Sequence, residues 1–227
     1  KNYFYPDLVK GYQISQYDVP ICSRGYVEIE REGKPKKIRL IRIHVEEDTG
    51  KSIHSEKGET LMDFNRSGVP LLEIVTEPDM NSPEEARSFL EKLKATLRYI
   101  EVSDCKMEEG SLRCDVNINV VEKSTGKKSK IIEMKNINSF KGVVKALEYE
   151  EKRHRELLSQ GKDTVRETRR WDDDRNKSLR MRWKLKENGL KIYEKISLNF
   201  LKKKKKDLCR NMVYLNMIRK YLQGQKN

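Results

Sequence analysis

The sequence predicts an α+β fold in which packed helices cover a mainly antiparallel sheet. Strand-like segments outnumber helix-like segments, and most of them are joined to a neighbour by a short turn, as in β-hairpins. The chain has 227 residues, of which 36% are hydrophobic, and this is enough for a real core. No run of about 18 apolar residues occurs, so neither a membrane-spanning helix nor a membrane partner is expected.

The first half of the chain is predicted to form a hairpin, a short strand and a helix. Apolar and polar residues alternate over residues 25–47 on both sides of Glu32-Gly33-Lys34, which predicts the hairpin. Its core candidates are Ile38, Leu40, Ile43 and Val45. A short apolar strand over 71–76 follows. Ser82, Pro83 and Glu85 then predict a helix start with a capping box, and the apolar stripe of this helix consists of Ala86, Phe89, Leu90, Leu93, Leu97 and Ile100.

The second half is predicted to contain two strands, a helix and a last strand. Residues 112–123 and 130–137 read as strands around a Ser-Thr-Gly turn, and 164–174 suggests the last strand. Between them, residues 140–160 predict a helix with Gly161 as its C-terminal cap. Its inward-facing residues are expected to be Val143, Val144, Leu147, Leu157 and Leu158.

The net charge of +13 comes mostly from the C-terminal tail. Residues 183–227 hold 13 Lys and Arg against 3 Asp and Glu, which leaves 36 basic and 33 acidic residues in 1–182. The body, 1–182, is therefore nearly balanced, and its ligand is not selected by bulk charge. The four cysteines are scattered without a C-x-x-C pair, which is typical of reduced thiols and predicts a cytoplasmic protein, or an organelle-matrix protein if the source is eukaryotic.

Acidic residues break the core-building pattern at three places. Glu46, Glu47 and Asp48 are consecutive at a predicted strand end, where like charges repel one another. Glu73 interrupts an apolar strand, where burying an unpaired carboxylate is costly. The third place is the stretch 106–115, with Glu108, Glu109 and Asp115 beside Arg113. Carboxylates that converge from separate strands can hold Mg²⁺ against substrate phosphates.

Each of these features also has a plain structural interpretation. An acidic strand end is more often a solvated turn, and Glu73 has the alternatives of an outward-facing side chain or a salt bridge to an arginine. His44 and His54 lack metal-ligand spacing and are interpreted as structural. The sequence has no glycine-rich phosphate loop of either common pattern.

Six longer motifs make the sequence recognisable. In order, they are KNYFYPDLVKGYQISQYD, IHVEEDTGK, DFNRSGVPLLEIVTEPD, KMEEGSLRCDVN, MKNINSF and ETRRWDDD. Over residues 1–182 the chain resembles the GatB/GatE family, in which GatB is the B subunit of the aspartyl/glutamyl-tRNA amidotransferases. The resemblance implies a cradle domain with a glutamine-synthetase-like core.

The resemblance also implies a reaction and its partners. An amidase subunit (GatA), accompanied by the small GatC subunit, releases ammonia from glutamine or asparagine. The cradle uses ATP and Mg²⁺ to phosphorylate the side-chain carboxylate of mischarged Glu-tRNA(Gln) or Asp-tRNA(Asn). Ammonia that arrives through a tunnel then displaces the phosphate. Such a mechanism depends on positioning and charge neutralisation, for which acidic metal ligands are suited.

The family's site residues carry over by motif. Glu47 resembles the carboxylate at the tunnel exit and metal site, and Glu73 resembles a second metal ligand; both are therefore expected to be catalytic. Lys1, Lys10 and Tyr3, together with Tyr5, resemble the lining of the ammonia path. Additional site candidates are Glu46, Glu109 and Arg113.

Two departures from the family matter. A further Glu and His of the family site lie in an upstream segment that this sequence lacks, and Val9 replaces a usual proline. We therefore expect a fragment that is inactive alone.

From residue 183 the sequence leaves the family pattern, but a shifted reading frame permits strings that resemble downstream family segments. Our hypothesis is that the tail is a frameshift product. The alternative is a non-catalytic RNA-binding protein that uses the cradle core and the basic tail.

Overall fold

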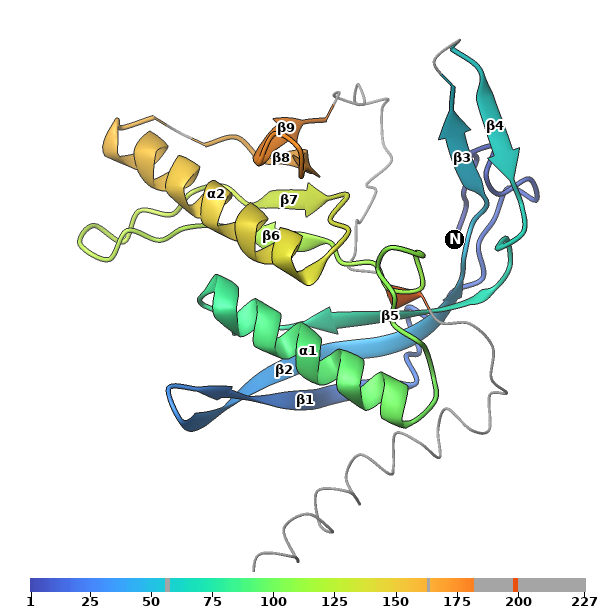
Figure 1. The fold of residues 1–227 in the computed structure, drawn as a ribbon, viewed down its shortest axis with the longest axis horizontal. Coiled ribbons are helices and arrows are strands. Elements are labelled where there is room, and N and C mark those ends of the chain that lie inside the picture. Colours follow the sequence, from blue (N-terminus) through green and yellow to red (C-terminus); the bar gives the residue numbers. More distant parts are fainter. Residues whose placement is uncertain (56–57, 163, 182–197, 200–227) are drawn as a thin grey trace, which may run out of the picture.

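The computed structural model describes residues 1–55, 58–162, 164–181 and 198–199 (Figure 1). The described residues form two four-stranded sheets, a separate two-stranded hairpin and two helices, which confirms the α+β fold class. None of the described helices is both long and apolar enough to cross a membrane.

The first sheet is antiparallel throughout, in the order β1-β2-β5-β10. Its strands are β1 (Cys22–Arg31), β2 (Lys34–Glu47), β5 (Pro70–Thr76) and β10 (Leu198–Asn199). The predicted hairpin is confirmed as β1 and β2. Glu32 and Gly33 make its turn with φ values of 51° and 73°, a left-handed conformation that glycine adopts without steric cost. The predicted strand 71–76 is confirmed as β5.

Helix α1 (Pro83–Tyr99) begins at the predicted residue. The Ser82 hydroxyl accepts a hydrogen bond from the Glu85 N–H, as an N-cap does. The expected reciprocal bond of a capping box differs, because the Glu85 carboxylate accepts from the N–H of Asn81 at 2.7 Å instead of from the N-cap. Glu85 also pairs with Arg31 and Lys36, so its side chain ties the helix start to the β1–β2 hairpin. The predicted stripe is buried except for Ile100, which is half-buried.

The second sheet has the order β6-β7-β8-β9. Its strands are β6 (Val116–Ile118), β7 (Ile132–Lys135), β8 (Glu167–Asp172) and β9 (Lys177–Arg180). The strands predicted over 112–123 and 130–137 exist but are shorter, and β9 was not predicted. Strands β7 and β8 pair in parallel, because helix α2 (Phe140–Ser159) forms the crossover between them.

The buried face of α2 is more polar than the sequence predicted. Val143 and Leu158 are buried as expected, but Val144, Leu147 and Leu157 are only half-buried. The face is completed by Glu150 and His154, both 0% exposed. Glu150 accepts hydrogen bonds from Ser178 and Arg153 and pairs with Arg169 at 3.2 Å, so its charge is matched inside the core.

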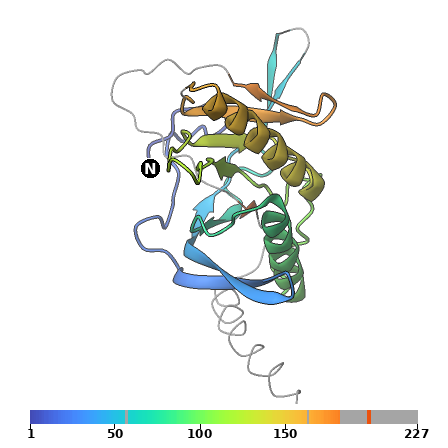
Figure 2. The same ribbon diagram turned by 90° about the vertical axis from the view of Figure 1, so that its left-hand side faces the viewer.

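Helix α1 lies against the first sheet and α2 against the second, and the helices pack on each other (Figures 1 and 2). One hydrophobic core therefore runs through both halves, from Ile38 of β2 through Phe89 of α1 to Met134 and Trp171 of the second sheet. The two-stranded hairpin of β3 (Lys51–His54) and β4 (Thr60–Asp63) extends away from this core (Figure 1). It was not predicted.

A bulge in β2 decides which side chains share a face of the first sheet. Leu40 and Ile43 are three positions apart, which strict alternation would place on opposite faces. Both nevertheless point into the core, because the register against β5 shifts between Leu40 and Arg42. Their strand neighbours Arg39 and His44 therefore both lie on the opposite face. This face carries the candidate site.

Candidate functional site

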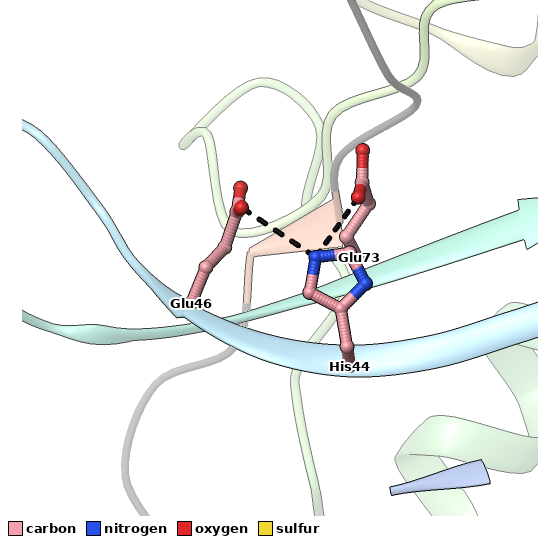
Figure 3. A group of neighbouring side chains, drawn as sticks. All are labelled: His44, Glu46 and Glu73. Atoms are coloured by element: carbon pink, nitrogen blue, oxygen red, sulfur yellow. Dashed lines mark ion pairs between the residues drawn. The ribbon is translucent and has the colours of Figure 1, made fainter. Parts of the chain in front are cut away.

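His44, Glu46 and Glu73 converge on one face of the first sheet (Figure 3). His44 on β2 is directly opposite Glu73 on β5, and Glu46 lies two residues further along β2, on the same side of the pleat. The His44 Nε2 is 3.0 Å from Glu73 Oε2 and 3.6 Å from Glu46 Oε2. One ligand atom from each of the three residues lies within 4.8 Å of the others.

This cluster is almost completely shielded from solvent. The side chains of His44, Glu73 and Glu46 are 0%, 1% and 10% exposed. Tyr17 packs its ring edge-on against His44 and carries the Arg42 guanidinium on its face. Within the described part of the chain, neither buried nitrogen of His44 makes a hydrogen bond. Two buried carboxylates beside one imidazole favour a bound cation, because like charges in low dielectric otherwise repel.

The donor set fits a divalent metal ion. Carboxylate oxygens suit Mg²⁺ and Mn²⁺, while an imidazole nitrogen also suits Zn²⁺ and other transition metals. The shielded His44 nitrogens are the observation that supports this fit, since buried polar atoms are normally partnered. We therefore treat the cluster as a candidate cation site.

Glu47 lies apart from this cluster, although Glu46 and Glu47 are adjacent. Its carboxylate oxygens are 2.7 and 2.5 Å from the Lys10 ammonium, and one of them accepts the N–H of Ile14 at 3.0 Å. Burial favours the neutral acid, but the Ile14 N–H and the Lys10 ammonium prevail and lower the pKa of Glu47. The structure thus joins Glu47 to Lys10 and brings Glu73 and Glu46 together at His44. The metal role that the family resemblance implies for Glu47 stays a prediction.

The expected ammonia-path residues lie on the N-terminal segment that runs past the end of β2. The backbone of Lys1 bonds to Gln13 in both directions, and the Gln13 amide donates to the Glu47 carbonyl at 2.7 Å. Tyr3 donates to Asp7 at 3.0 Å and packs on Tyr5 with ring centroids 5.2 Å apart. Burial and the Asp7 carboxylate raise the pKa of Tyr3, so its hydroxyl stays protonated.

The third acid of the motif, Asp48, holds the candidate residue Arg113. The Asp48 carboxylate oxygens are 2.7 and 2.6 Å from Arg113 Nη2, and the Asp48 residue is only 5% exposed. Arg66 lies at 3.8 Å on the same carboxylate. The three consecutive acids therefore take three different partners: Glu46 faces His44 in the candidate cation site, Glu47 pairs with Lys10, and Asp48 joins the first sheet to the loop that precedes β6.

Glu109 is not part of the cluster. It pairs with Lys106 at 2.7 Å, with both side chains about half exposed.

The sequence reasoning missed His44 as a cluster member and also missed Lys135, which lies between Asp115 and Glu133 at 3.7 and 3.6 Å. The His-x-Glu spacing on a predicted strand was a usable signal for His44, because alternate residues share a face. The side chain of His54 lies outside the described residues.

Comparisons with known proteins show which proteins this chain is similar to. Residues 1–208 match the family model described as the GatB/GatE catalytic domain. The chain is 60% identical over 192 residues to a relative from Finegoldia magna and 60% identical over 185 residues to one from Caldicellulosiruptor bescii. It is 55% identical over 194 residues to a third, from Clostridium tetani. Each of the three is named as the B subunit of an aspartyl/glutamyl-tRNA(Asn/Gln) amidotransferase.

The matched regions cover most of this chain but a minor part of each relative. They include 85%, 81% and 85% of this chain, and 41%, 38% and 40% of the three relatives. The chain therefore spans about two fifths of the length of these curated relatives. With a family model that matches most of its residues, the chain belongs to the GatB/GatE catalytic-domain family.

Proposed function

We propose that this chain carries the carboxylate-activating centre of the B subunit of a tRNA-dependent amidotransferase. In the proposed reaction, the side-chain carboxylate of a glutamate or aspartate esterified to tRNA takes the γ-phosphoryl group of ATP. Ammonia then attacks the acyl phosphate, and phosphate leaves as the amide forms. The observation that carries the proposal is the shielded cluster of His44, Glu46 and Glu73 one residue from the Lys10–Glu47 pair.

His44, Glu46 and Glu73 are the residues that would hold a divalent cation. A Mg²⁺ ion there would neutralise phosphate charge during phosphoryl transfer. The protein's own contribution is to fix the donors beforehand. The antiparallel register sets His44 against Glu73, and the core on the other face of the sheet holds both strands in place.

The Lys10–Glu47 pair is suited to receive ammonia at the edge of this centre. Because its pKa is lowered, Glu47 remains ionised and is a weak base. Its role is therefore to accept a hydrogen bond from ammonia and orient it, and Lys10 holds the carboxylate in place. Lys1 and Tyr3 would line the approach. The ammonia source in this proposal is a separate amidase subunit, GatA, assembled with GatC.

Cation binding by the purified chain tests the proposal. Titration with Mn²⁺, followed by calorimetry or by the loss of the free-ion electron paramagnetic resonance signal, should show one site. Glu73→Gln should weaken it by about tenfold or more, because a ligand charge is lost. The matched control, Glu109→Gln, removes an exposed carboxylate and should leave the affinity unchanged. Equal Mn²⁺ affinity for Glu73→Gln and the wild-type chain would contradict the assignment.

Activity is tested in a full-length GatB protein that carries this chain's residues, assembled with its amidase partner. Glu47→Gln should then slow amide formation more than it slows ATP cleavage, since it acts on ammonia. Glu73→Gln should slow both steps. If the two variants slowed both steps equally, the separate roles of the two carboxylates would be refuted.

A further inference from the structure

A cavity of about 600 Å³ opens at the β1–β2 hairpin, next to the loop that connects β5 to α1. Its lining includes four cationic side chains, one carboxylate and one aromatic ring: Arg24, Lys36, Lys37, Arg39, Asp79 and Tyr26. The cavity is separate from the cluster of His44, Glu46 and Glu73, and none of its residues was singled out by the sequence.

Two of the four cations already have partners. Arg39 makes a double hydrogen bond to Asp79 at 2.8 and 2.6 Å, and Lys36 pairs with Glu85 at 2.6 Å. Hydrogen bonds and charge from Arg39 lower the pKa of Asp79 to about 2, although burial alone would raise it. Asp79 is therefore ionised, and the pair intact, at neutral pH.

The other two cations, Arg24 and Lys37, leave the cavity with net positive charge. Both are exposed, and neither forms an ion pair with an acid in the described part of the chain. The cavity therefore presents two uncompensated charges in a body that is nearly balanced overall, and it favours an anionic ligand.

An aromatic ring lies beside these charges. The Lys37 ammonium is 4.4 Å from the centroid of the Tyr26 ring, and Tyr26 is 37% exposed. Cations that follow a phosphate backbone, combined with an accessible aromatic ring on which a base can stack, are the chemistry of single-stranded nucleic acid binding. Duplex binding uses the charges but leaves no free base for the ring.

The position of the cavity relates it to the candidate site. Residues five positions apart on a regular strand point to opposite faces. The bulge in β2 adds one residue between Arg39 and His44, so these two side chains lie on the same face of the sheet. They are five residues apart on one strand, which is roughly 16 Å at about 3.3 Å per residue. A polymer that reacts at its end beside His44 would thus pass the cavity within a few units of that end.

We propose that the cavity binds a single-stranded RNA segment, with phosphates against Arg24 and Lys37 and a base on Tyr26. The inference deepens the proposed function, on which it rests: the segment is the unpaired stretch of the substrate tRNA that precedes the esterified amino acid. The cavity holds the RNA, and the amino acid reaches the cation site.

The test measures binding of a fluorescein-labelled ten-nucleotide single-stranded RNA to the whole chain by anisotropy, over a series of salt concentrations. Arg24→Gln/Lys37→Gln removes the two cavity cations that form no ion pair with an acid in the described part of the chain. Lys141→Gln/Lys152→Gln removes two exposed charges on α2, neither of which forms an ion pair in the described part of the chain, and serves as the matched control. The basic tail is identical in all three proteins, so its contribution cancels.

The cavity variant should lower the slope of log K against log salt by about 1.4, since each single-strand phosphate contact contributes about 0.7. The control should leave the slope unchanged. Tyr26→Leu should weaken single-stranded RNA binding about fivefold or more and should leave binding of a duplex of equal length unchanged. Equal slopes for the cavity variant and the control, or equal Tyr26→Leu effects on single-stranded and duplex RNA, would overturn the inference.

Mn²⁺ titration of the same variants separates this inference from the proposed function. None of the substitutions touches His44, Glu46 or Glu73, so Mn²⁺ affinity should equal that of the wild type. Intact Mn²⁺ binding with no cavity-specific RNA effect overturns the RNA inference alone. A cavity-specific RNA effect in a chain that binds no Mn²⁺ overturns the cation assignment instead.

Discussion

Removing the charge of Arg113 should destabilise the protein by about 2 kcal/mol. Breaking a buried ion pair by removing one partner costs about 3–5 kcal/mol, because the remaining charge is left unpaired in low dielectric. Asp48 is 5% exposed, but the Arg113 side chain is 34% exposed, which reduces the expected cost. The Asp48 carboxylate also keeps the Thr49 N–H at 2.9 Å and Arg66 at 3.8 Å. These contacts place the loss below the fully buried range.

Urea denaturation of a double-mutant cycle measures this pair. Arg113→Met and Asp48→Asn should each lower the free energy of unfolding, and the double variant should lose about 1–2 kcal/mol less than the sum, because the pair is then absent as a whole. Arg87→Met in the exposed Arg87–Glu91 pair, where the side chains are 60% and 52% exposed, is the control and should cost less than about 0.5 kcal/mol. Additive losses in the cycle would refute the claim that Asp48 and Arg113 join the first sheet to the loop that precedes β6.

Two further predictions concern the second half of the molecule. Glu150→Gln should lower the free energy of unfolding by about 3 kcal/mol, because Arg153 and Arg169 would lose the buried anion they share; a change below about 1 kcal/mol in urea denaturation would contradict this. Burial, opposed by Lys135 and assisted by Glu133, raises the pKa of Asp115 to about 6, against about 3.9 for an unfolded aspartate. The native state therefore binds more protons between about pH 4 and 6, and this carboxyl makes the protein less stable as pH rises through that window. Asp115→Asn should thus raise the midpoint of thermal unfolding at pH 7.5 and leave it unchanged at pH 3.5, and a gain of equal size at both pH values would count against the buried-carboxyl explanation.

Local signals in the sequence predicted most of the fold. The N-cap Ser82 and Pro83 fixed the start of α1, and the apolar stripe of that helix identified the face that it buries. The two-residue turn at Glu32-Gly33 and the alternation around it predicted the β1–β2 hairpin. These features depend on neighbours a few residues away, which is why they were visible without the structure.

The parts that were not predicted depend on contacts between distant segments. The parallel pairing of β7 with β8 follows from how α2 packs, and periodicity carries no information about it. The polar buried face of α2 is another example, since Arg169 pairs with Glu150, and Ser129 contacts His154, from other segments of the chain. From helical periodicity alone, charged and polar residues such as Glu150 and His154 are predicted to face solvent.

The sequence named two of the three residues of the candidate site, but it did not show which residues lie together. Glu46 and Glu73 were both candidates, but the bulge and register of β2 against β5 decide that they meet at His44. The alternation of a strand separates Glu46 from Glu47, and this consequence of the pleat was available from the sequence. Asp48 contacts Arg113 because the loop before β6 folds back onto the first sheet. Local sequence patterns carry no information about this long-range contact.

The tail assignment remains a hypothesis at the level of the gene. Apart from Leu198 and Asn199, which pair with β5, residues 183–227 lie outside the described residues. The nucleotide sequence of codons 175–227 decides it. A shifted frame that encodes the downstream family segments supports a frameshift, whereas a frame with stops or unrelated residues contradicts it.

The position of a bound divalent cation tests the central claim most directly. Crystals of the chain soaked with Mn²⁺ would give an anomalous difference peak at each occupied site. The account predicts a peak about 2.0–2.6 Å from a His44 nitrogen and from carboxylate oxygens of Glu46 and Glu73. A peak on Glu47 without His44, or no peak in this face of the sheet, would contradict it.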